Sequence, residues 1–68
     1  MSVTILLNGE PRSVAAALSV SQLVESLGLR GKRIAVERNG EIVPKSRYAS
    51  TRVDAGDKLE IVAAVGGG

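Results

Sequence analysis

The stretch VTILLNGEPRSVAAALSVSQLVESLGL, residues 3–29, predicts a β-hairpin followed by one helix. Residues 3–7 are β-branched or apolar at every position, so both faces of this strand are expected to need cover, as in the centre of a sheet. Asn8-Gly9 favours a type I′ turn, which needs positive φ at both central positions. The returning strand is expected over residues 11–15. Pro11 favours an edge position or the first residue of that strand, because it cannot donate a ladder hydrogen bond.

The helix has start and stop signals of its own. Ser19 and Gln22 have the spacing of a capping box, in which each side chain accepts a hydrogen bond from the other residue's backbone N–H. Leu18 and Leu23 occupy the positions of a hydrophobic staple. Gly28 is placed to end the helix in the left-handed conformation. The apolar residues repeat at helical spacing and predict one buried stripe: Val20, Leu23, Val24 and Leu27.

The second half of the chain predicts another hairpin and a final strand. Residues 34–38 alternate toward a second Asn-Gly pair, Asn39-Gly40, and residues 41–44 return. Residues 45–51 are short and polar, with Tyr48 expected to anchor a single helical turn through its ring. Asp54 and Asp57 belong to a turn, after which residues 58–65 alternate and then become apolar on both faces.

The order is therefore strand, strand, helix, strand, short strand, strand. The first and last strands are the most apolar, so we expect them to be central neighbours, joined in parallel, with the helix crossing one face. This is an α+β fold of the β-grasp, or ubiquitin-like, type, with a mixed sheet of four to five strands and one main helix. Residues 1–65 are expected to form the domain and residues 66–68 a flexible glycine tail.

Composition argues against several functions. The 68 residues, enough for one domain, include no cysteine and no histidine, so a disulfide, a structural metal or a nucleophilic enzyme site is not expected. The glycines at the end of the sequence have no following helix or lysine, which argues against a phosphate-binding loop. We expect a protein that is not an enzyme and that binds no metal and no cofactor.

Charge and hydropathy point to a cytoplasmic protein that contacts neither nucleic acid nor membrane. The net charge of +2 permits nucleic-acid binding, but Tyr48 is the only aromatic residue available for stacking, which favours a solvated basic face. The first apolar run is too short to span a bilayer and has neither a basic flank nor a cleavage pattern.

Five segments together resemble a known family. They are the opening strand into LLNGE, SVSQLVESLGL, IAVERNGEIVPKSRY, DAGDKLEIV and the terminal glycines. Over almost the whole chain, this sequence resembles the ThiS-like sulfur carrier proteins of thiamin thiazole synthesis. The resemblance implies that an ATP-using, E1-like (ThiF-like) enzyme adenylates the carboxylate of Gly68. A persulfide sulfur donor then makes a thiocarboxylate, and a ThiG-like thiazole synthase takes the sulfur.

The tail fits that role and also departs from the family pattern. Gly66, Gly67 and Gly68 lack a Cβ, which suits entry into narrow partner active sites. The family usually ends in two glycines, whereas this sequence ends in three. Either Gly66 is the small residue that precedes the family pair, or the register is offset by one, or the glycine at the end of the chain is an expression scar.

Three alternatives remain open at this point. The same tail suits a MoaD-like carrier for molybdopterin or cysteine synthesis, a ubiquitin-like protein modifier, or a plain binding module. We further expect a docking surface for the activating enzyme, against the alternative that these side chains are simply solvated. Its predicted residues are Lys58, Glu60 and Val62 of the last strand, with Arg38 and Arg47.

Overall fold

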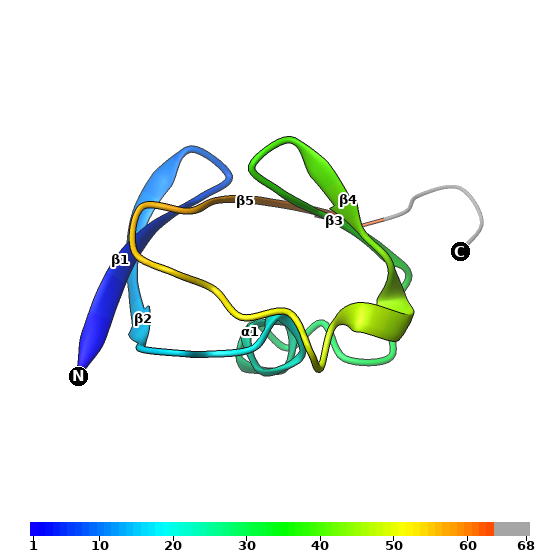
Figure 1. The fold of residues 1–68 in the computed structure, drawn as a ribbon. Helices are drawn as coiled ribbons and strands as arrows, with labels where there is room; N and C mark the ends of the chain where they lie inside the picture. The colour runs from blue at the N-terminus through cyan, green and yellow to red at the C-terminus, as the bar shows by residue number, and fades with distance from the viewer. Residues whose placement is uncertain (64–68) are drawn as a thin grey trace.

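The computed structural model describes residues 1–63, which form a five-stranded sheet with α1 packed on one face (Figure 1). The elements are β1 (Ser2–Leu7), β2 (Glu10–Ala15), α1 (Val20–Ser26), β3 (Ile34–Arg38), β4 (Glu41–Val43), the 3-10 turn η1 (Lys45–Arg47) and β5 (Lys58–Ala63). The strand order is β2-β1-β5-β3-β4, and β1 and β5 run in parallel while the other neighbours are antiparallel. The predicted β-grasp fold is confirmed. Positions 64–65 of the predicted last strand lie outside the described residues.

Both hairpins turn as their Asn-Gly pairs predict. The φ angles are 51° and 83° at Asn8 and Gly9, and 52° and 85° at Asn39 and Gly40. Pro11 lies in β2, which is an edge strand, as expected. The second hairpin ends earlier than predicted, because β4 stops at Val43 and Pro44 becomes the extended residue that precedes η1.

The helix begins and ends at the predicted residues. The Ser19 hydroxyl accepts the Gln22 N–H at 3.1 Å, and the Gln22 side-chain oxygen accepts the Ser19 N–H at 3.0 Å. Gly28 has a φ of 73°, and its N–H donates to the Glu25 carbonyl at 3.0 Å. The capping box and the left-handed stop are therefore confirmed.

The core lies between α1 and the sheet. Its buried apolar side chains are Ile5, Leu7, Val20, Leu23, Val24, Val36, Val43, Val53, Leu59 and Ile61. Tyr48, which follows η1, packs against this core as predicted. Val53 belongs to the connection between η1 and β5, and its N–H donates to the Leu18 carbonyl at 2.8 Å, which ties the connection to the start of α1.

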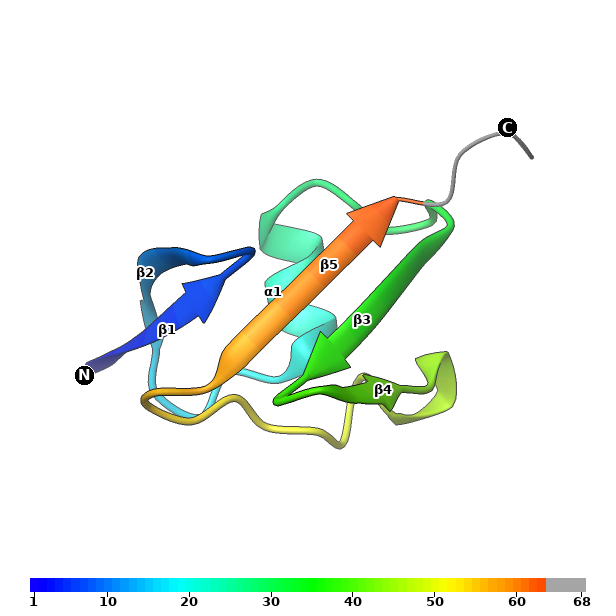
Figure 2. The ribbon, with the colours of Figure 1, turned by 90° about the horizontal axis from the view of Figure 1, so that it is seen from above.

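The expectation that both faces of the first strand need cover is wrong within residues 1–63, and the last strand is likewise covered on one face only. In β1, Ile5 and Leu7 are buried, whereas Thr4 is exposed and Leu6 is half-buried. In β5, Val62 remains 59% exposed. Figure 2 looks onto the sheet with α1 behind it, and no element of residues 1–63 covers the near face. We call this uncovered side of the sheet the open face.

Candidate functional site

β5 is the element that leads to the predicted tail. The predicted tail residues Gly66, Gly67 and Gly68 lie outside the described residues, so the site is built from their support. β5 is central in the sheet, with β1 on one side and β3 on the other. Its buried residues Leu59 and Ile61 anchor it in the core. The tail is therefore preceded by a strand that is held by neighbours on both edges and by packing beneath.

Each Asn-Gly turn also holds β5 through its asparagine side chain. The Asn8 amide donates to the Ile61 carbonyl at 3.1 Å and accepts the Ile61 N–H at 2.8 Å. The Asn39 side-chain oxygen accepts the Lys58 N–H at 2.9 Å. The backbone N–H groups of Asn8 and Asn39 donate to the carbonyls of Leu59 and Lys58, each at 2.8 Å. The two turns thus complete the hydrogen bonding of β5 where the neighbouring strands end.

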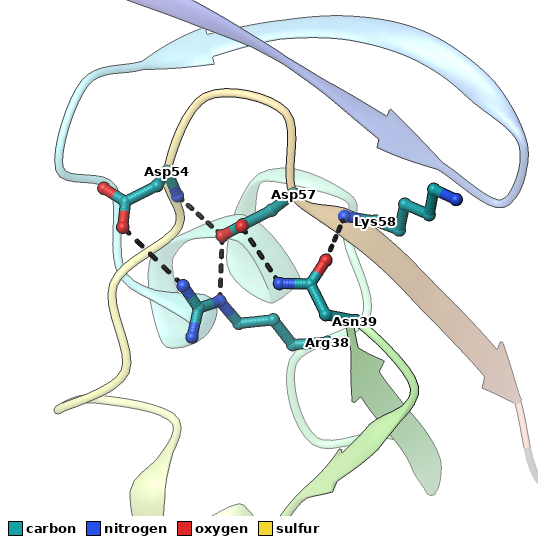
Figure 3. Close-up of polar contacts among 5 residues, drawn as sticks. All are labelled: Arg38, Asn39, Asp54, Asp57 and Lys58. Atoms are coloured by element: carbon teal, nitrogen blue, oxygen red, sulfur yellow. Dashed lines mark hydrogen bonds and ion pairs between the residues drawn. The ribbon is translucent and has the colours of Figure 1, made fainter.

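Asp57 immediately precedes β5 and lies in a network of polar contacts (Figure 3). Its carboxylate accepts the Arg38 Nε–H at 2.8 Å, the Asp54 backbone N–H at 2.8 Å and the Asn39 amide at 3.1 Å. Burial raises the pKa of Asp57, but these hydrogen bonds and the Arg38 charge outweigh burial, so the pKa lies below its ordinary value. The prediction that Asp54 and Asp57 serve a turn is confirmed.

The open face combines exposed apolar and charged side chains. Val62 lies opposite Ala35, and Glu60 lies opposite Glu37, across the β3–β5 pairing. Ile42 of β4 is paired with Glu37 and is 65% exposed. Directly opposed like charges destabilise a sheet, so Glu37 and Glu60 are not explained by the stability of this domain alone. An uncovered face with exposed apolar side chains is typical of a surface that binds another protein.

The structure divides the predicted docking residues into two groups. Lys58, Glu60 and Val62 alternate with the buried residues of β5, and they lie together on the open face. Arg38 is paired with the buried Leu59, which places it toward the side of α1, where it also lies 3.6 Å from the Asp54 carboxylate. Arg38 and Arg47 line a separate shallow depression of about 370 Å³.

Three open-face residues were missed by the sequence reasoning: Ala35, Glu37 and Ile42. The alternation of residues 34–38 around the buried Val36 is the signal that places the first two on the face opposite α1. The position of Ile42 follows from the two-residue turn, which sets the register of β4 on β3. Combining the alternation of all strands would have predicted this surface.

Other kinds of site are not found in the described part of the chain. Residues 1–63 contain no group of three histidine, cysteine, aspartate or glutamate side chains arranged to hold a metal ion. Over the same residues, no helix is both long enough and apolar enough to cross a membrane.

Comparisons with known proteins agree with this architecture. The model of the ThiS family matches residues 5–68. A crystal structure of the thiamine biosynthesis protein (ThiS) from Geobacter metallireducens superposes with a TM-score of 0.84 at 32% sequence identity, covering 97% of this chain and 100% of that one. The sulfur carrier protein ThiS of Bacillus subtilis is 42% identical over 50 residues, which are 74% of this chain and 76% of that protein.

A longer protein contains a segment that is similar to this chain. The thiazole synthase of Paramagnetospirillum magneticum is 53% identical over 64 residues, which are 94% of this chain. The chain spans only 20% of the length of that thiazole synthase. The family model matches residues 5–68 and the ThiS crystal structure has the same fold over 97% of the chain, so this chain belongs to the ThiS family.

Proposed function

We propose that this protein is a sulfur carrier of thiamin thiazole synthesis that carries sulfur as a thiocarboxylate on Gly68. The observation that carries the proposal is the family match, which extends to residue 68 and so includes Gly66, Gly67 and Gly68. The relatives named as ThiS and thiazole synthase support the thiamin pathway over a molybdopterin or cysteine pathway.

The proposed chemistry takes place at the carboxylate, in the active sites of partners. A carboxylate is a poor electrophile until one oxygen becomes part of a good leaving group. One carboxylate oxygen of Gly68 attacks the α-phosphorus of ATP, and pyrophosphate leaves. Sulfide then attacks the acyl carbon of the adenylate, and AMP leaves with the electrons of the C–O bond. In this proposal, ATP binds to the activating enzyme and the carrier itself is not a catalyst. We propose the cytoplasm as the place of the reaction.

In this proposal, the folded domain supplies the binding energy that holds the tail in a partner's active site. Fixing the backbone of a glycine tail in a partner's active site costs about 1–2 kcal/mol per residue. The open face, with Ile42 and Val62 exposed, supplies apolar area that a partner can bury to offset that cost. β5 links this surface directly to the tail, so docking of the open face brings the tail to the partner's active site.

Thiazole synthase is the partner that we propose to accept the sulfur. In Paramagnetospirillum magneticum, a segment similar to this chain is part of a protein named thiazole synthase. That covalent connection supports a functional connection between the two components. In a separate protein, the same encounter would depend on a binding surface instead of a peptide link.

Intact-mass spectrometry tests the proposal. The protein is incubated with ATP, sodium sulfide and the ThiF-like activating enzyme, and a copy that lacks Gly68 serves as the matched control. We expect a mass gain equal to the exchange of one oxygen for one sulfur, located in the C-terminal peptide and absent without ATP. No gain with an activating enzyme that is active on another carrier would contradict the proposal.

Three further measurements distinguish the other functions. Adducts in which the C-terminus is joined to target lysines would indicate a protein modifier. Transfer of the sulfur to a molybdopterin precursor, but not to the product of thiazole synthase, would indicate a MoaD-like carrier. If removal of Gly67 and Gly68 left the cellular function intact, the protein would be a binding module.

A further inference from the structure

A hollow of about 660 Å³ lies at one end of the molecule, between α1, the start of β3 and η1. Its floor is apolar and includes Val24 of α1, Ile34 of β3 and Tyr48, which follows η1. At the far side it reaches Ala35 and Val62, a cross-strand pair of the open face. We call this hollow the α1–η1 groove. Of the docking residues described above, only Val62 lines this groove, and through Val62 the groove borders the open face.

The rim of the groove is mainly basic, with four cationic side chains against one acidic side chain, Glu25. Arg30, Lys32 and Arg33 come from the loop after α1, and Lys45 comes from η1. All four are exposed, and Arg30 makes only a 4.0 Å contact with Glu25 between two solvated side chains. The other three form no ion pair within residues 1–63. An apolar floor beneath this net positive rim is complementary to a ligand that has both an apolar group and negative charge.

The loop that carries three of these cations is held in place. The Leu29 N–H donates to the Val24 carbonyl at 3.1 Å, and the Lys32 N–H donates to the Leu29 carbonyl at 3.0 Å. Gly31, with a φ of 80°, lies between them and allows the tight bend. The backbone under the cations is therefore defined before any ligand binds, although the long side chains themselves are free to adapt.

The groove also contains an uncovered strand edge. β4 pairs with β3 only over residues 36–38 of β3, so Ile34 and Ala35 have β5 on one side and no partner from β4 on the other. The chain leaves the sheet at Pro44 and enters η1, whose Lys45 lines the opposite wall. A short free edge beside an apolar floor suits an extended peptide segment, because such segments bind by adding to sheet edges.

We propose that the α1–η1 groove binds an extended acidic segment of the protein partner that receives the tail, with one apolar side chain of that segment seated over Tyr48. This inference rests on the proposed function. Proximity supports it, because Val62 lines the groove and is only four residues before Gly66, the first residue of the tail. A partner that holds the tail is therefore within reach of the groove.

A peptide segment fits better than a small molecule or a nucleic acid. Small-molecule sites fix their ligand with a few precisely placed polar groups, whereas every buried side-chain polar atom of residues 1–63 already has a hydrogen-bond partner. The cations are long, exposed side chains on the rim, which suit the carboxylates of an extended peptide segment. Tyr48 is half-buried in the floor, which leaves no series of aromatic rings for stacking bases.

Charge-reversal variants test the proposal with thiazole synthase and the activating enzyme as probes. Arg33→Glu and Lys45→Glu reverse one rim charge each, and Arg12→Glu makes the same charge change on β2, the opposite edge of the sheet. By isothermal titration calorimetry at two salt concentrations, each rim variant should weaken binding of one of the two enzymes by about tenfold, with a reduced salt dependence. The Arg12→Glu protein should bind within about twofold of wild type.

Amide NMR spectra of the labelled carrier locate the contact and exclude misfolding. Adding the enzyme should perturb the amides of residues 29–34 and 46–49, and the free variants should keep the dispersed spectrum of the wild type. Equal affinities for Arg33→Glu, Lys45→Glu and Arg12→Glu, or no perturbation of these amides, would overturn the proposal. It would also be wrong if sodium phosphate, a single-stranded oligonucleotide or self-association at high protein concentration gave the perturbation instead.

The two proposals fail in different ways. Thiocarboxylate formation on the wild-type protein is measured by mass alone and requires no knowledge of where the partner docks. If the thiocarboxylate forms but the rim variants bind like the Arg12→Glu control, only the groove is wrong. If wild type binds neither enzyme and gains no sulfur, the proposed function is wrong and the groove proposal falls with it.

Discussion

The two Asn-Gly turns have the same backbone conformation but hold β5 in different chemical environments. The side chain of Asn8 bonds only to backbone groups, and both of its contacts are with Ile61, near the end of the strand. Asn39 holds the start of the strand at Lys58 and also donates to the carboxylate of Asp57. Identical local sequence thus gives a neutral clamp on one side of β5 and an ionic clamp on the other. The difference depends on the residues that the rest of the fold brings to each turn.

The largest loss of stability is expected when the carboxylate of Asp57, the anion of the ionic clamp, is removed. Asp57→Ala leaves the Asp54 N–H and the Asn39 amide without their acceptor, and Arg38 without its nearest counter-ion. We expect the free energy of unfolding to fall by about 2–4 kcal/mol, because three part-buried hydrogen bonds to a buried, charged acceptor are lost together. Urea denaturation measures the change. The Asp54→Ala control should lose less than about 1 kcal/mol, since that carboxylate is 76% exposed.

Replacing each asparagine in turn measures how far the Asn8 and Asn39 turns differ. Asn8→Ala and Asn39→Ala should each lower the free energy of unfolding by about 2 kcal/mol, from lost hydrogen bonds and from placing alanine at positive φ. Combined with Asp57→Ala, the Asn39 change should show a coupling of about 1 kcal/mol, whereas the Asn8 change should add within about 0.5 kcal/mol.

Amide hydrogen exchange separates the two clamps locally. The Ile61 amide should exchange faster in the Asn8→Ala protein, and the Lys58 amide in the Asn39→Ala protein, because each loses its side-chain acceptor. In the double-variant unfolding measurements, an equal coupling energy of both asparagines to Asp57 would show that the clamps are not chemically distinct.

The smallest expected effect is the pH dependence of the ionic clamp. The pKa of Asp57 is lowered from its ordinary value of 3.8, so the unfolded chain binds a proton more readily than the native protein. The stabilisation is therefore fully present above the unfolded pKa and is lost as the pH falls through the folded pKa. We expect the stability difference between wild type and Asp57→Asn to be constant near neutral pH and to shrink in acid. For Asn8→Ala the difference should not change with pH, and a parallel decrease would refute the distinction.

Much of the fold could be predicted because its signals are local. The capping box at Ser19 and Gln22, the stop at Gly28 and both Asn-Gly turns are read from neighbouring residues, and the structure confirms each. The parallel pairing of β1 with β5 followed from the order and apolarity of the strands. The early end of β4 was missed because Pro44 is compatible with either a strand edge or the residue before a helical turn.

The candidate site was harder to predict because it depends on which face each side chain occupies. Arg38 and Lys58 were assigned to one surface, but their opposite alternation places them on different faces of the sheet. The bonds of Asn8 to Ile61 join residues 53 positions apart, and no local pattern indicates them. The α1–η1 groove likewise needs three separate elements to be assembled before its basic rim can be recognised.

The central place of β5 has a consequence for how the molecule assembles. The two hairpins are local and close over two-residue turns, whereas the strand between them comes last in the described sequence and pairs with both. Until β5 is present, β1 and β3 have no partner on their inner edges and the helix has only part of its sheet to pack against. Closing the long loop from β1 to β5 is entropically demanding, so the final strand should set the rate at which the sheet is completed.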